Sequence, residues 1–203
     1  MNITAIAHAE MGQQLLAELA AYRYRVFVET LGWTLNCAPQ RELDQFDHAD
    51  AHYVLLRDRE GRLSGCARLL PTTRPYLLSE VFPMLAPGGL PSDAAVWELS
   101  RFVTLSPDSE AQATGGNPAL RQFSSDQAIA LLQAAIDHAS AQGVSRLVTV
   151  SPVGVERLLT MAGFSAGRLA PPQTVGGRRL FACQIECRPR QVQVQPAQAA
   201  VAA

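Results

Sequence analysis

The chain contains no long hydrophobic run, although 48% of its 203 residues are hydrophobic. Its uninterrupted apolar stretches extend over only a few residues, whereas a membrane-spanning helix needs about 20, so none is expected. The first residues, Met1 to Thr4, also lack the basic segment and apolar stretch of a secretory signal peptide. We therefore predict a cytoplasmic protein that folds as one compact domain around a hydrophobic core.

Cysteine pairs and clustered histidines, the usual marks of disulfides and metal sites, are missing as well. The four cysteines, Cys37, Cys66, Cys183 and Cys187, include no Cys-x-x-Cys pair. Cys183 and Cys187 share one expected strand, where four residues span roughly 13 Å, too far for a disulfide. We interpret all four as reduced thiols, as is usual in the cytosol. The four histidines are scattered without metal-ligand spacing, so no metal site is expected.

Neither sign of charge dominates, because 17 Lys and Arg residues face 18 Asp and Glu residues. Such a chain has no overall field to attract a polyanion, so nucleic acid is not the expected partner, although a local basic patch is compatible with this balance. We expect no membrane partner either.

Hydrophobic periodicity predicts an α/β (α+β) fold. Helices are expected at 11–31, 77–85, 119–142 and 153–162, and strands at 53–57, 63–70, 95–105, 146–150 and 180–187. Early antiparallel strands followed by helix-connected strands indicate a three-layer α-β-α sandwich with a mixed, largely antiparallel sheet. We assign residues 1–187 to a single domain and the Gln-, Pro-, Val- and Ala-rich residues 188–203 to a disordered tail.

Two short motifs resemble known functional signatures. Residues 163–167, Gly-Phe-Ser-Ala-Gly, fit the Gly-x-Ser-x-Gly elbow of hydrolases, but a helix is expected where the elbow needs a strand. We interpret them as a helix cap. Residues 112–117 partly match the loop that binds the pyrophosphate of coenzyme A in N-acetyltransferases. Asn117 replaces a small residue there and Pro118 removes an amide donor, so we favour a plain connecting loop.

The most informative stretch is 97–102, Trp-Glu-Leu-Ser-Arg-Phe, where an expected strand carries two charges. Charged side chains are almost never fully buried unless they are paired, so Glu98 and Arg101 need partners or a charged ligand. Residues three apart face opposite sides of a regular strand. A pocket shared by Glu98 and Arg101 therefore requires a bulge or a splay near Leu99 to Val103, which would leave a backbone amide for an oxyanion.

Other aromatic and charged residues are candidates for the same pocket. They are Arg23, Phe27, Trp33, Asp44, Asp47 and Arg68. Arginines suit a carboxylate, acids suit an ammonium or a ribose, and aromatic rings suit a purine or a sulfonium. Taken singly, each also has a plain structural interpretation as a core aromatic, a solvated helix residue or a loop-capping acid.

The order of these residues along the chain matches a known pattern. The motifs are Arg23-x-x-Val26-Phe27, Gly32-Trp33, Glu42-x-Asp44-x-Phe46-Asp47, Cys66-Ala67-Arg68-Leu69-Leu70-Pro71-Thr72-Thr73, Pro75-Tyr76-x-Leu78, Val81-Phe82-Pro83, Glu98-Leu99-Ser100-Arg101-Phe102 and Val148-Thr149-Val150. Together they resemble the acyl-homoserine lactone synthases, the LuxI-type autoinducer synthases. Within that family the branch that makes the octanoyl signal is most similar.

This resemblance implies an N-acyltransferase (GNAT)-like fold and the synthesis of an N-octanoyl-homoserine lactone. The substrates would be S-adenosylmethionine, as a co-substrate rather than a tightly bound cofactor, and an octanoyl group on acyl carrier protein. The methionine amine would attack the thioester, and the methionine carboxylate would then displace methylthioadenosine. The resemblance implies that Glu98 is the base and that Arg101 is also catalytic. The implied S-adenosylmethionine-binding residues are Arg23, Phe27, Trp33, Asp44, Asp47, Arg68, Phe82, Phe102 and Val103.

The acyl chain is expected in an apolar tunnel between the sheet and the long helix, lined by Phe123, Val148 and Thr149. Thr149 matches a position where relatives that accept 3-oxo chains often have threonine, whereas the octanoyl resemblance indicates an unsubstituted chain. We favour octanoyl because it rests on more residues. For docking of the acidic carrier protein we expect a basic patch, which would otherwise be ordinary solvated surface. Its residues are Arg157, Arg168, Arg178 and Arg179.

Two other functions remain open from the sequence alone. One is an acetyl-coenzyme A-dependent N-acetyltransferase, which the imperfect loop at 112–117 makes less favourable. The other is a regulatory domain that senses adenosylmethionine or an acyl lactone, but it would leave Glu98 without a role, and no DNA-binding helix pair is evident.

Overall fold

A mixed β-sheet forms the centre of the protein in the computed structural model, which describes residues 1–105 and 125–188. The strands are β1 (Asn2–Ala7), β2 (His52–Arg57), β3 (Leu63–Pro71), β4 (Val96–Thr104), β5 (Arg146–Pro152), β6 (Ala166–Arg168), β7 (Gln173–Val175) and β8 (Arg178–Glu186). Their order across the sheet is β1-β2-β3-β4-β5-β8-β6, and β7 pairs with β8. Among these strands β4 and β5 run parallel, and the other neighbours are antiparallel.

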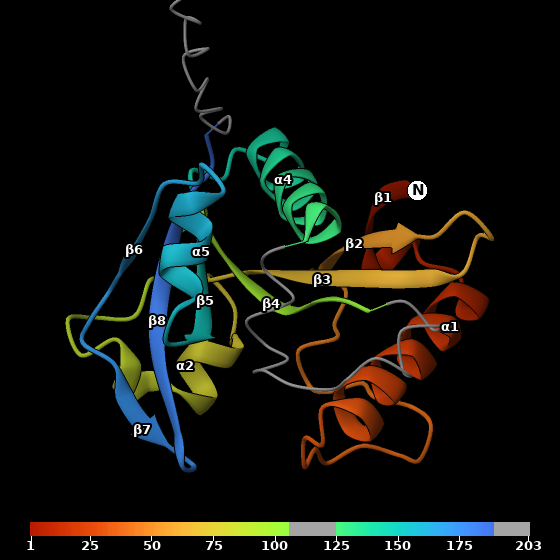
Figure 1. Ribbon diagram of the computed structural model, residues 1–203, viewed down its shortest axis with the longest axis horizontal. Helices are drawn as coiled ribbons and strands as arrows, with labels where there is room; N and C mark the ends of the chain where they lie inside the picture. Colours follow the sequence, from red (N-terminus) through yellow and green to blue (C-terminus); the bar gives the residue numbers. More distant parts are fainter. Residues whose placement is uncertain (106–124, 189–203) are drawn as a thin grey trace, which may run out of the picture.

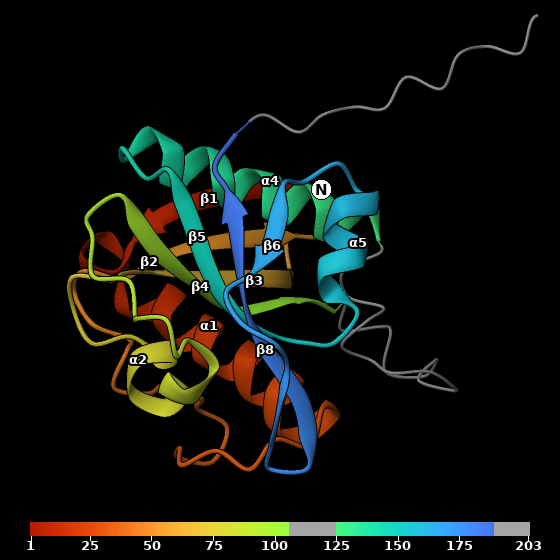
Figure 2. The same ribbon diagram turned by 90° about the vertical axis from the view of Figure 1, so that its left-hand side faces the viewer.

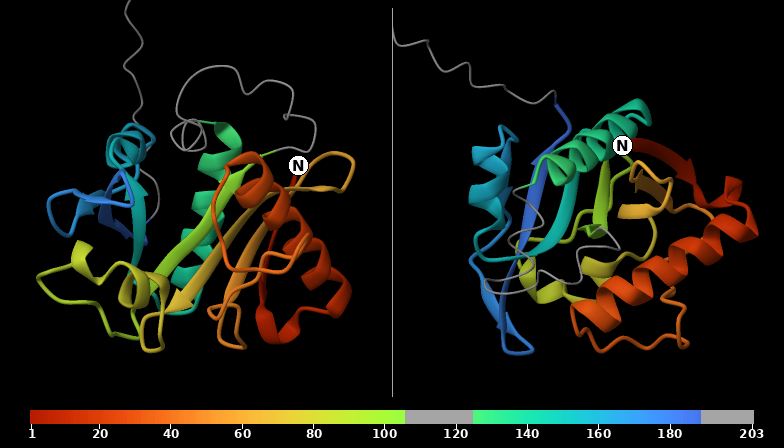
Figure 3. Two further views of the ribbon diagram at one scale, coloured as in Figure 1. Left: turned by 90° about the horizontal axis from the view of Figure 1, so that it is seen from below. Right: turned by 45° about the vertical axis from the view of Figure 1, so that its right-hand side comes forward.

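Helices cover both faces of the sheet, so the described residues form three layers (Figures 1 and 2). The helices are η1 (His8–Glu10), α1 (Gln13–Arg23), the π-helix η2 (Tyr24–Thr30), α2 (Leu77–Val81), η3 (Pro83–Leu85), α4 (Asp126–Ala141) and α5 (Val155–Met161). Helices α1 and α2 lie on one face, and α4 and α5 lie on the other. The right panel of Figure 3 shows α1 and η2 as one continuous helix, with the loop that follows returning along it.

Strand alternation explains why the molecule has two separate cores. In β2, Tyr53 and Leu55 pack toward α1, while Val54 and Leu56 pack toward α4. Because successive side chains of a strand point to opposite faces, an almost entirely apolar strand can fill both cores. Strand β2 is therefore central in the sheet although its sequence does not alternate between polar and apolar residues.

All five predicted strands are present, with slightly shifted ends. Three others were missed: β1 is a largely exposed edge strand, and β6 and β7 have only three residues each. The prediction of one helix over 77–85 is wrong, because α2 ends before Phe82 and a separate turn follows at Pro83, which lacks an N–H. The predicted connection at 106–118, the start of the 119–142 helix and the tail from 189 onward lie outside the described residues.

Residues 163–165 form a helix end, as predicted, whereas Ala166 and Gly167 already belong to β6. Helix α5 precedes them, Phe164 N–H donates to the carbonyl of Leu159 at 3.0 Å, and Gly163 has a φ of 86°. This left-handed glycine is typical of a helix C-terminus. The hydrolase interpretation of this motif is therefore wrong.

The predicted bulge in β4 is present. Cys66 pairs with Val103 and Arg68 pairs with Ser100, so β4 advances three residues while β3 advances two. Arg101 has a φ of 50°, in the left-handed region that non-glycine residues rarely adopt. The extra residue reverses the alternation: Val96 and Val103 face the same core, although a regular strand would point them to opposite sides. Glu98 and Arg101 therefore both face α1 and α2.

A splay begins at the same place. Strands β4 and β5 pair only where Val96 to Glu98 lie beside Arg146 to Val148. Beyond these residues β4 continues beside β3 and β5 continues beside β8, so the two parallel strands diverge (Figure 1). Glu98 is the last residue of β4 before the divergence.

Gly65 allows the close approach of β3 to its neighbours near the bulge. A Cβ added to Gly65 would lie 3.0 Å from Leu56 Cβ and 3.1 Å from the carbonyl oxygen of Val103. We expect Gly65→Ala to lower the free energy of unfolding by about 1–3 kcal/mol in urea titrations, because overpacking forces backbone shifts. Gly167→Ala, where a Cβ meets nothing within 4 Å, should change it by less than about 0.5 kcal/mol. Equal midpoints for both variants would contradict this account.

Candidate active site

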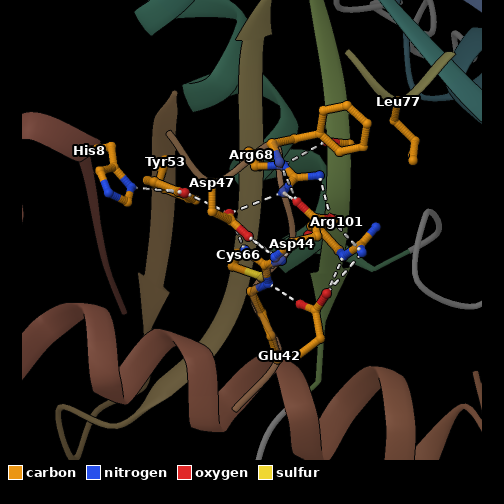
Figure 4. Close-up of polar contacts among 12 residues, drawn as sticks. His8, Glu42, Asp44, Asp47, Tyr53, Cys66, Arg68, Leu77 and Arg101 are labelled. Carbon is orange, nitrogen blue, oxygen red and sulfur yellow. Dashed lines mark hydrogen bonds and ion pairs between the residues drawn. The ribbon is translucent and has the colours of Figure 1, made fainter. Parts of the chain in front are cut away.

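Three arginines and three carboxylates form a buried ionic network on the α1 side of the sheet (Figure 4). The arginines are Arg23 at the end of α1, Arg68 in β3 and Arg101 in the bulge of β4, and the carboxylates are Glu42, Asp44 and Asp47. The three acids lie in the loop between η2 and β2, so this network attaches the loop to the helix and to the sheet.

The six groups alternate in charge and close into a ring. Arg23 binds Glu42, and Arg23 Nη1 lies 2.7 Å from Asp47 Oδ1. Arg101 Nη2 lies 2.8 Å from both Glu42 Oε1 and Asp44 Oδ2.

Arg68 closes this ring of alternating charges. Its Nη1 lies 2.5 Å from Asp44 Oδ1 and 3.0 Å from Asp47 Oδ1, and its Nε donates to Ser100 Oγ at 3.1 Å. Each arginine thus bridges two acids and each acid bridges two arginines, so the formal charges cancel within the ring. Arg68 also binds Asp44 through two parallel hydrogen bonds, Nη1 to Oδ1 and Nη2 to Oδ2, and such bidentate arginine–carboxylate contacts are the stronger class of ion pair.

The ring keeps its members charged in spite of their burial. Burial alone would raise the pKa of Asp47, but the Arg68 and Arg23 guanidinium groups hold it well below its usual range. Burial likewise opposes ionisation of Glu42, and Arg23 and Arg101 lower its pKa. Paired and hydrogen-bonded charges can be held in an apolar interior in this way, whereas single charges cannot.

Aromatic rings flank the Arg101 side of the charge ring. The Phe27 and Trp33 rings lie with centroids 4.8 Å apart, and the Arg101 guanidinium carbon lies 5.6 Å from the Phe27 centroid and 5.9 Å from that of Trp33. Phe27 belongs to the π-helix η2, and its carbonyl accepts a hydrogen bond from the Trp33 N–H at 2.8 Å. Segments of π-helix are frequent at functional sites. The structure therefore brings together all six residues predicted to share a pocket with Glu98 and Arg101.

Glu42 and Tyr53 belong to the network but were not among the predicted site residues. Glu42 stands two residues before Asp44 in a quoted motif, so a third acid in one loop was a usable signal. Tyr53 donates its hydroxyl to Asp47 Oδ1 at 2.7 Å, and His8 Nδ1 lies 3.3 Å from that hydroxyl (Figure 4). A tyrosine near the start of an apolar strand gives no such signal in the sequence.

Glu98 lies outside the charge ring but on the same side of the sheet. Its carboxylate is fully buried, and it accepts the N–H of Leu77 at 2.9 Å and of Leu78 at 2.7 Å, the first two residues of α2. Burial raises the pKa of Glu98 to about 7, although the two amides, Arg68 and Arg101 act in the opposite direction. A carboxylate with this pKa is suited to remove a proton from an amine, whose ordinary pKa is about 8.

The remaining predicted binding residues are divided between the two cores. Phe82, after α2, and Val103, in β4, pack into the core on the α1 side. The Phe102 side chain packs into the α4 core instead, because the bulge turns it to the other face. Only the backbone of Phe102 can therefore act together with Glu98.

The predicted acyl-pocket residues also separate. Val148 packs into the core on the α1 side, whereas Thr149 lies opposite Cys183, which belongs to the α4 core. Thr149 thus lies on the face of the sheet that carries α4 and α5, and Val148 lies on the opposite face. Phe123 lies outside the described residues.

The predicted basic patch is spread over two places. Arg157 is exposed on α5, and Arg168 in β6 pairs with Glu156, Nε to Oε2, at 2.5 Å. Arg178 and Arg179 begin β8. They precede Cys183, the strand partner of Arg168, by five and four residues, which is about 14–17 Å along a strand. The four arginines therefore form two separate pairs.

The described residues contain no group of three or more His, Cys, Asp or Glu side chains that fits a metal ion. Within the same residues no helix has both the length and the apolar character needed to cross a membrane. All four cysteines are free.

Removing one acid should break the ring. Glu42→Ala would leave Arg23 and Arg101 each without one buried partner, so we expect the free energy of unfolding to fall by about 3–5 kcal/mol in urea titrations. The control is Glu18→Ala, which removes the partly exposed pair with Arg57 and should cost less than about 1 kcal/mol. Similar losses for both variants would show that the ring adds nothing beyond ordinary ion pairs.

Comparison with known proteins identifies the family to which this sequence is similar. Residues 7–194 match the family described as Autoinducer synthase. An acyl-homoserine-lactone synthase of Acinetobacter nosocomialis is 50% identical over 187 residues, which are 92% of this chain and 100% of that protein.

Solved structures agree with this assignment. TofI, in a ternary complex with an inhibitor and MTA, is 38% identical with a TM-score of 0.78, over 94% of both chains. BjaI, a CoA-dependent acyl-homoserine lactone synthase with SAM and isopentyl-CoA, is 30% identical with a TM-score of 0.76, over 92% of this chain and 83% of that one.

A wider likeness concerns the fold alone. A putative N-acetyltransferase from Lactobacillus plantarum is 18% identical, with a TM-score of 0.57 over 93% of this chain and 100% of that one. This likeness confirms the predicted GNAT-like architecture with its mixed, largely antiparallel sheet. Because the family match covers most of the sequence and half of the aligned residues are identical to a known synthase, the chain belongs to the autoinducer synthase family and is an acyl-homoserine-lactone synthase.

Proposed function

We propose that this synthase makes N-octanoyl-homoserine lactone from S-adenosylmethionine and octanoyl-acyl carrier protein in the cytoplasm. Related structures contain SAM or MTA, which supports S-adenosylmethionine as the co-substrate. The observation that carries the residue roles is the bulge of β4, because it turns Glu98 and Arg101 to one side of the sheet at the point where β4 and β5 diverge.

The most accessible part of the charge ring is proposed to bind the methionine portion of the substrate. Asp44 has 14% of its side chain exposed and Arg101 has 7%, whereas the other four members have 2% or less. This acid and this arginine suit an ammonium and a carboxylate, respectively. The adjacent faces of Phe27 and Trp33 suit the sulfonium or the adenine ring.

In the first step Glu98 takes a proton from the methionine ammonium, directly or through a water. The neutral amine then attacks the thioester carbon, and a backbone N–H between Phe102 and Thr104 stabilises the developing oxyanion. The carbon–sulfur bond of the thioester breaks, the proton on Glu98 passes to the departing thiolate, and Glu98, again ionised, takes the second proton from the nitrogen as the amide forms. The buried position of Glu98 and its pKa of about 7 support this role.

In the second step the methionine carboxylate attacks its own γ-carbon. The bond from that carbon to the sulfonium sulfur breaks, methylthioadenosine leaves, and the lactone ring closes. Holding the two reacting atoms together accounts for about 7–11 kcal/mol of rate enhancement when the geometry is near attack. No side-chain nucleophile is needed in either step.

The acyl chain is proposed to pass from one side of the sheet to the other. Glu98 lies on the α2 side, and Thr149 lies on the α4 side. Strands β4 and β5 are not paired beyond Glu98 and Val148, so the chain can enter between them and extend toward α4. This path agrees with the expected tunnel between the sheet and the long helix.

Acyl carrier protein is the proposed donor because exposed arginines lie at two places near β5: Arg157 on α5, and Arg178 and Arg179 at the start of β8, the strand neighbour of β5. A negatively charged carrier protein would be attracted to these arginines. BjaI is described as CoA-dependent, so the donor is the part of this proposal that most needs a direct test.

The donor test compares octanoyl-acyl carrier protein with octanoyl-coenzyme A, each supplied with S-adenosylmethionine. We expect methylthioadenosine release and N-octanoyl-homoserine lactone with the carrier protein substrate, and at least tenfold lower kcat/KM with the coenzyme A substrate. Chromatography measures the methylthioadenosine, and mass spectrometry identifies the lactone. A preference for octanoyl-coenzyme A would overturn the donor, and a dominant lactone of another length would overturn the chain assignment.

Thr149 should influence the choice of acyl chain. We expect Thr149→Ala to shift the products from an equimolar mixture of hexanoyl, octanoyl and decanoyl substrates toward decanoyl, because the smaller side chain leaves more room. Thr149→Val, which keeps the shape and removes only the hydroxyl, is the matched control and should keep the octanoyl preference. An unchanged product profile in Thr149→Ala, measured by mass spectrometry, would take Thr149 out of the acyl pocket.

A further inference from the structure

The backbone at the start of α2 makes an unusual contact with Glu98. Both carboxylate oxygens accept main-chain hydrogen bonds, Oε1 from the Leu78 N–H at 2.7 Å and Oε2 from the Leu77 N–H at 2.9 Å. In a helix the first N–H groups have no partner within the helix, and a side chain of an adjacent residue usually caps them. Here the caps come from a strand about twenty residues further along the chain.

Within the described part of the chain, no cation forms an ion pair with this carboxylate. The ion pairs within residues 1–105 and 125–188 do not include Glu98, and the two arginines on its side of the sheet, Arg68 and Arg101, bind acids of the charge ring. A fully buried carboxylate without such a partner depends on hydrogen bonds for its orientation and for its charge.

The elements around Glu98 supply two arginines, a tyrosine and a valine as its neighbours. Strand β3 supplies Arg68 and β4 supplies Arg101, and both lower the pKa of Glu98 from a distance. The segment before α2 supplies Tyr76, whose pKa is raised to about 12 by burial and by the Glu98 charge. Strand β5 places the apolar Val148 beside Glu98.

We propose that the backbone N–H groups of Leu77 and Leu78 are positioning groups for the acylation step, which orient the Glu98 carboxylate at the divergence of β4 and β5 and stabilise its charge. This proposal rests on Glu98 acting as the base of the synthase. Each carboxylate oxygen can accept more than one hydrogen bond, so both oxygens stay able to receive a proton from an amine. The start of α2 would thus take the part that an aspartate or a histidine side chain plays in orienting other catalytic bases.

The backbone at Leu77 permits a direct test. Leu77 is the first residue of α2, where proline is well tolerated, and Tyr76 before it is extended, with φ of −136° and ψ of 166°, as a residue preceding proline must be. Leu77→Pro therefore removes one N–H donor to Glu98 and leaves the carboxylate in place. Leu77→Ala is the matched control, because it shortens the same half-buried side chain and keeps the N–H.

The measurement is the pH profile of kcat/KM, with the octanoyl thioester that the wild type uses better. Loss of a hydrogen bond to the charged form makes Glu98 easier to protonate, so the acidic limb of Leu77→Pro should move to higher pH by about one to two units. The limb of Leu77→Ala should stay at the wild-type position, because the N–H remains. If residue 77 served only for packing, both substitutions would change kcat/KM, and the acidic limb of both pH profiles would stay at the wild-type position.

A second variant covers the case in which Leu77→Pro does not fold, as judged by circular dichroism. Replacing Leu77 by the corresponding α-hydroxy acid turns its amide into an ester, which deletes the N–H and keeps the leucine side chain. The same upward shift of the acidic limb is expected.

Two outcomes would overturn the proposal. An unshifted limb in the folded proline or ester variant would show that the amides do not set the protonation of Glu98. Equal shifts in Leu77→Ala and Leu77→Pro would assign the effect to side-chain packing. Glu98→Gln distinguishes failure of this positioning proposal from failure of the proposed function. If Glu98→Gln forms the lactone at the wild-type rate and with the wild-type acidic limb, Glu98 is not the base. Lactone formation by the wild type would still support the proposed function.

Discussion

The closed ring of alternating charges is the interaction on which the rest of the site depends. Six ionised groups are held almost entirely out of water, and each of them contacts two groups of opposite charge. Leaving one such charge unpaired costs several kcal/mol, so the loop that carries the three acids can occupy only the position that closes the ring. Because Trp33 lies in the same loop as Asp44, closing the ring also positions the proposed substrate surface.

The ring also explains how the bulge of β4 is maintained. Arg101 adopts a left-handed backbone conformation that disfavours a side chain with a Cβ atom, and its guanidinium contacts two acids and two aromatic rings. These contacts offset the strain. The bulge in turn places Arg101 on the side of the sheet where Glu98 lies, so the proposed base and the proposed substrate-binding arginine share one face.

Much of this arrangement was predictable, and the misses have physical reasons. The strands of the sheet follow from their apolar periodicity, and the bulge follows from two charges three residues apart in one strand. Glu42 and Tyr53 escaped prediction because their role depends on partners distant in sequence. The opposite faces of Val148 and Thr149 follow from strand alternation alone, so two neighbours in one strand cannot both line one pocket. The contact of Glu98 with Leu77 and Leu78 involves main-chain atoms, which carry no residue-specific signal.

The bulge makes the length of β4 as important as its composition. Deleting Phe102 would restore a regular strand in which Val103 keeps its place in the core on the α1 side, but Arg101 would then point to the α4 core. The charge ring would lose Arg101, and Glu42 and Asp44 would each lose one of their two arginine partners. In this segment a single-residue deletion would therefore be more damaging than most substitutions, because the extra residue of the bulge keeps Glu98 and Arg101 on the same face of the sheet.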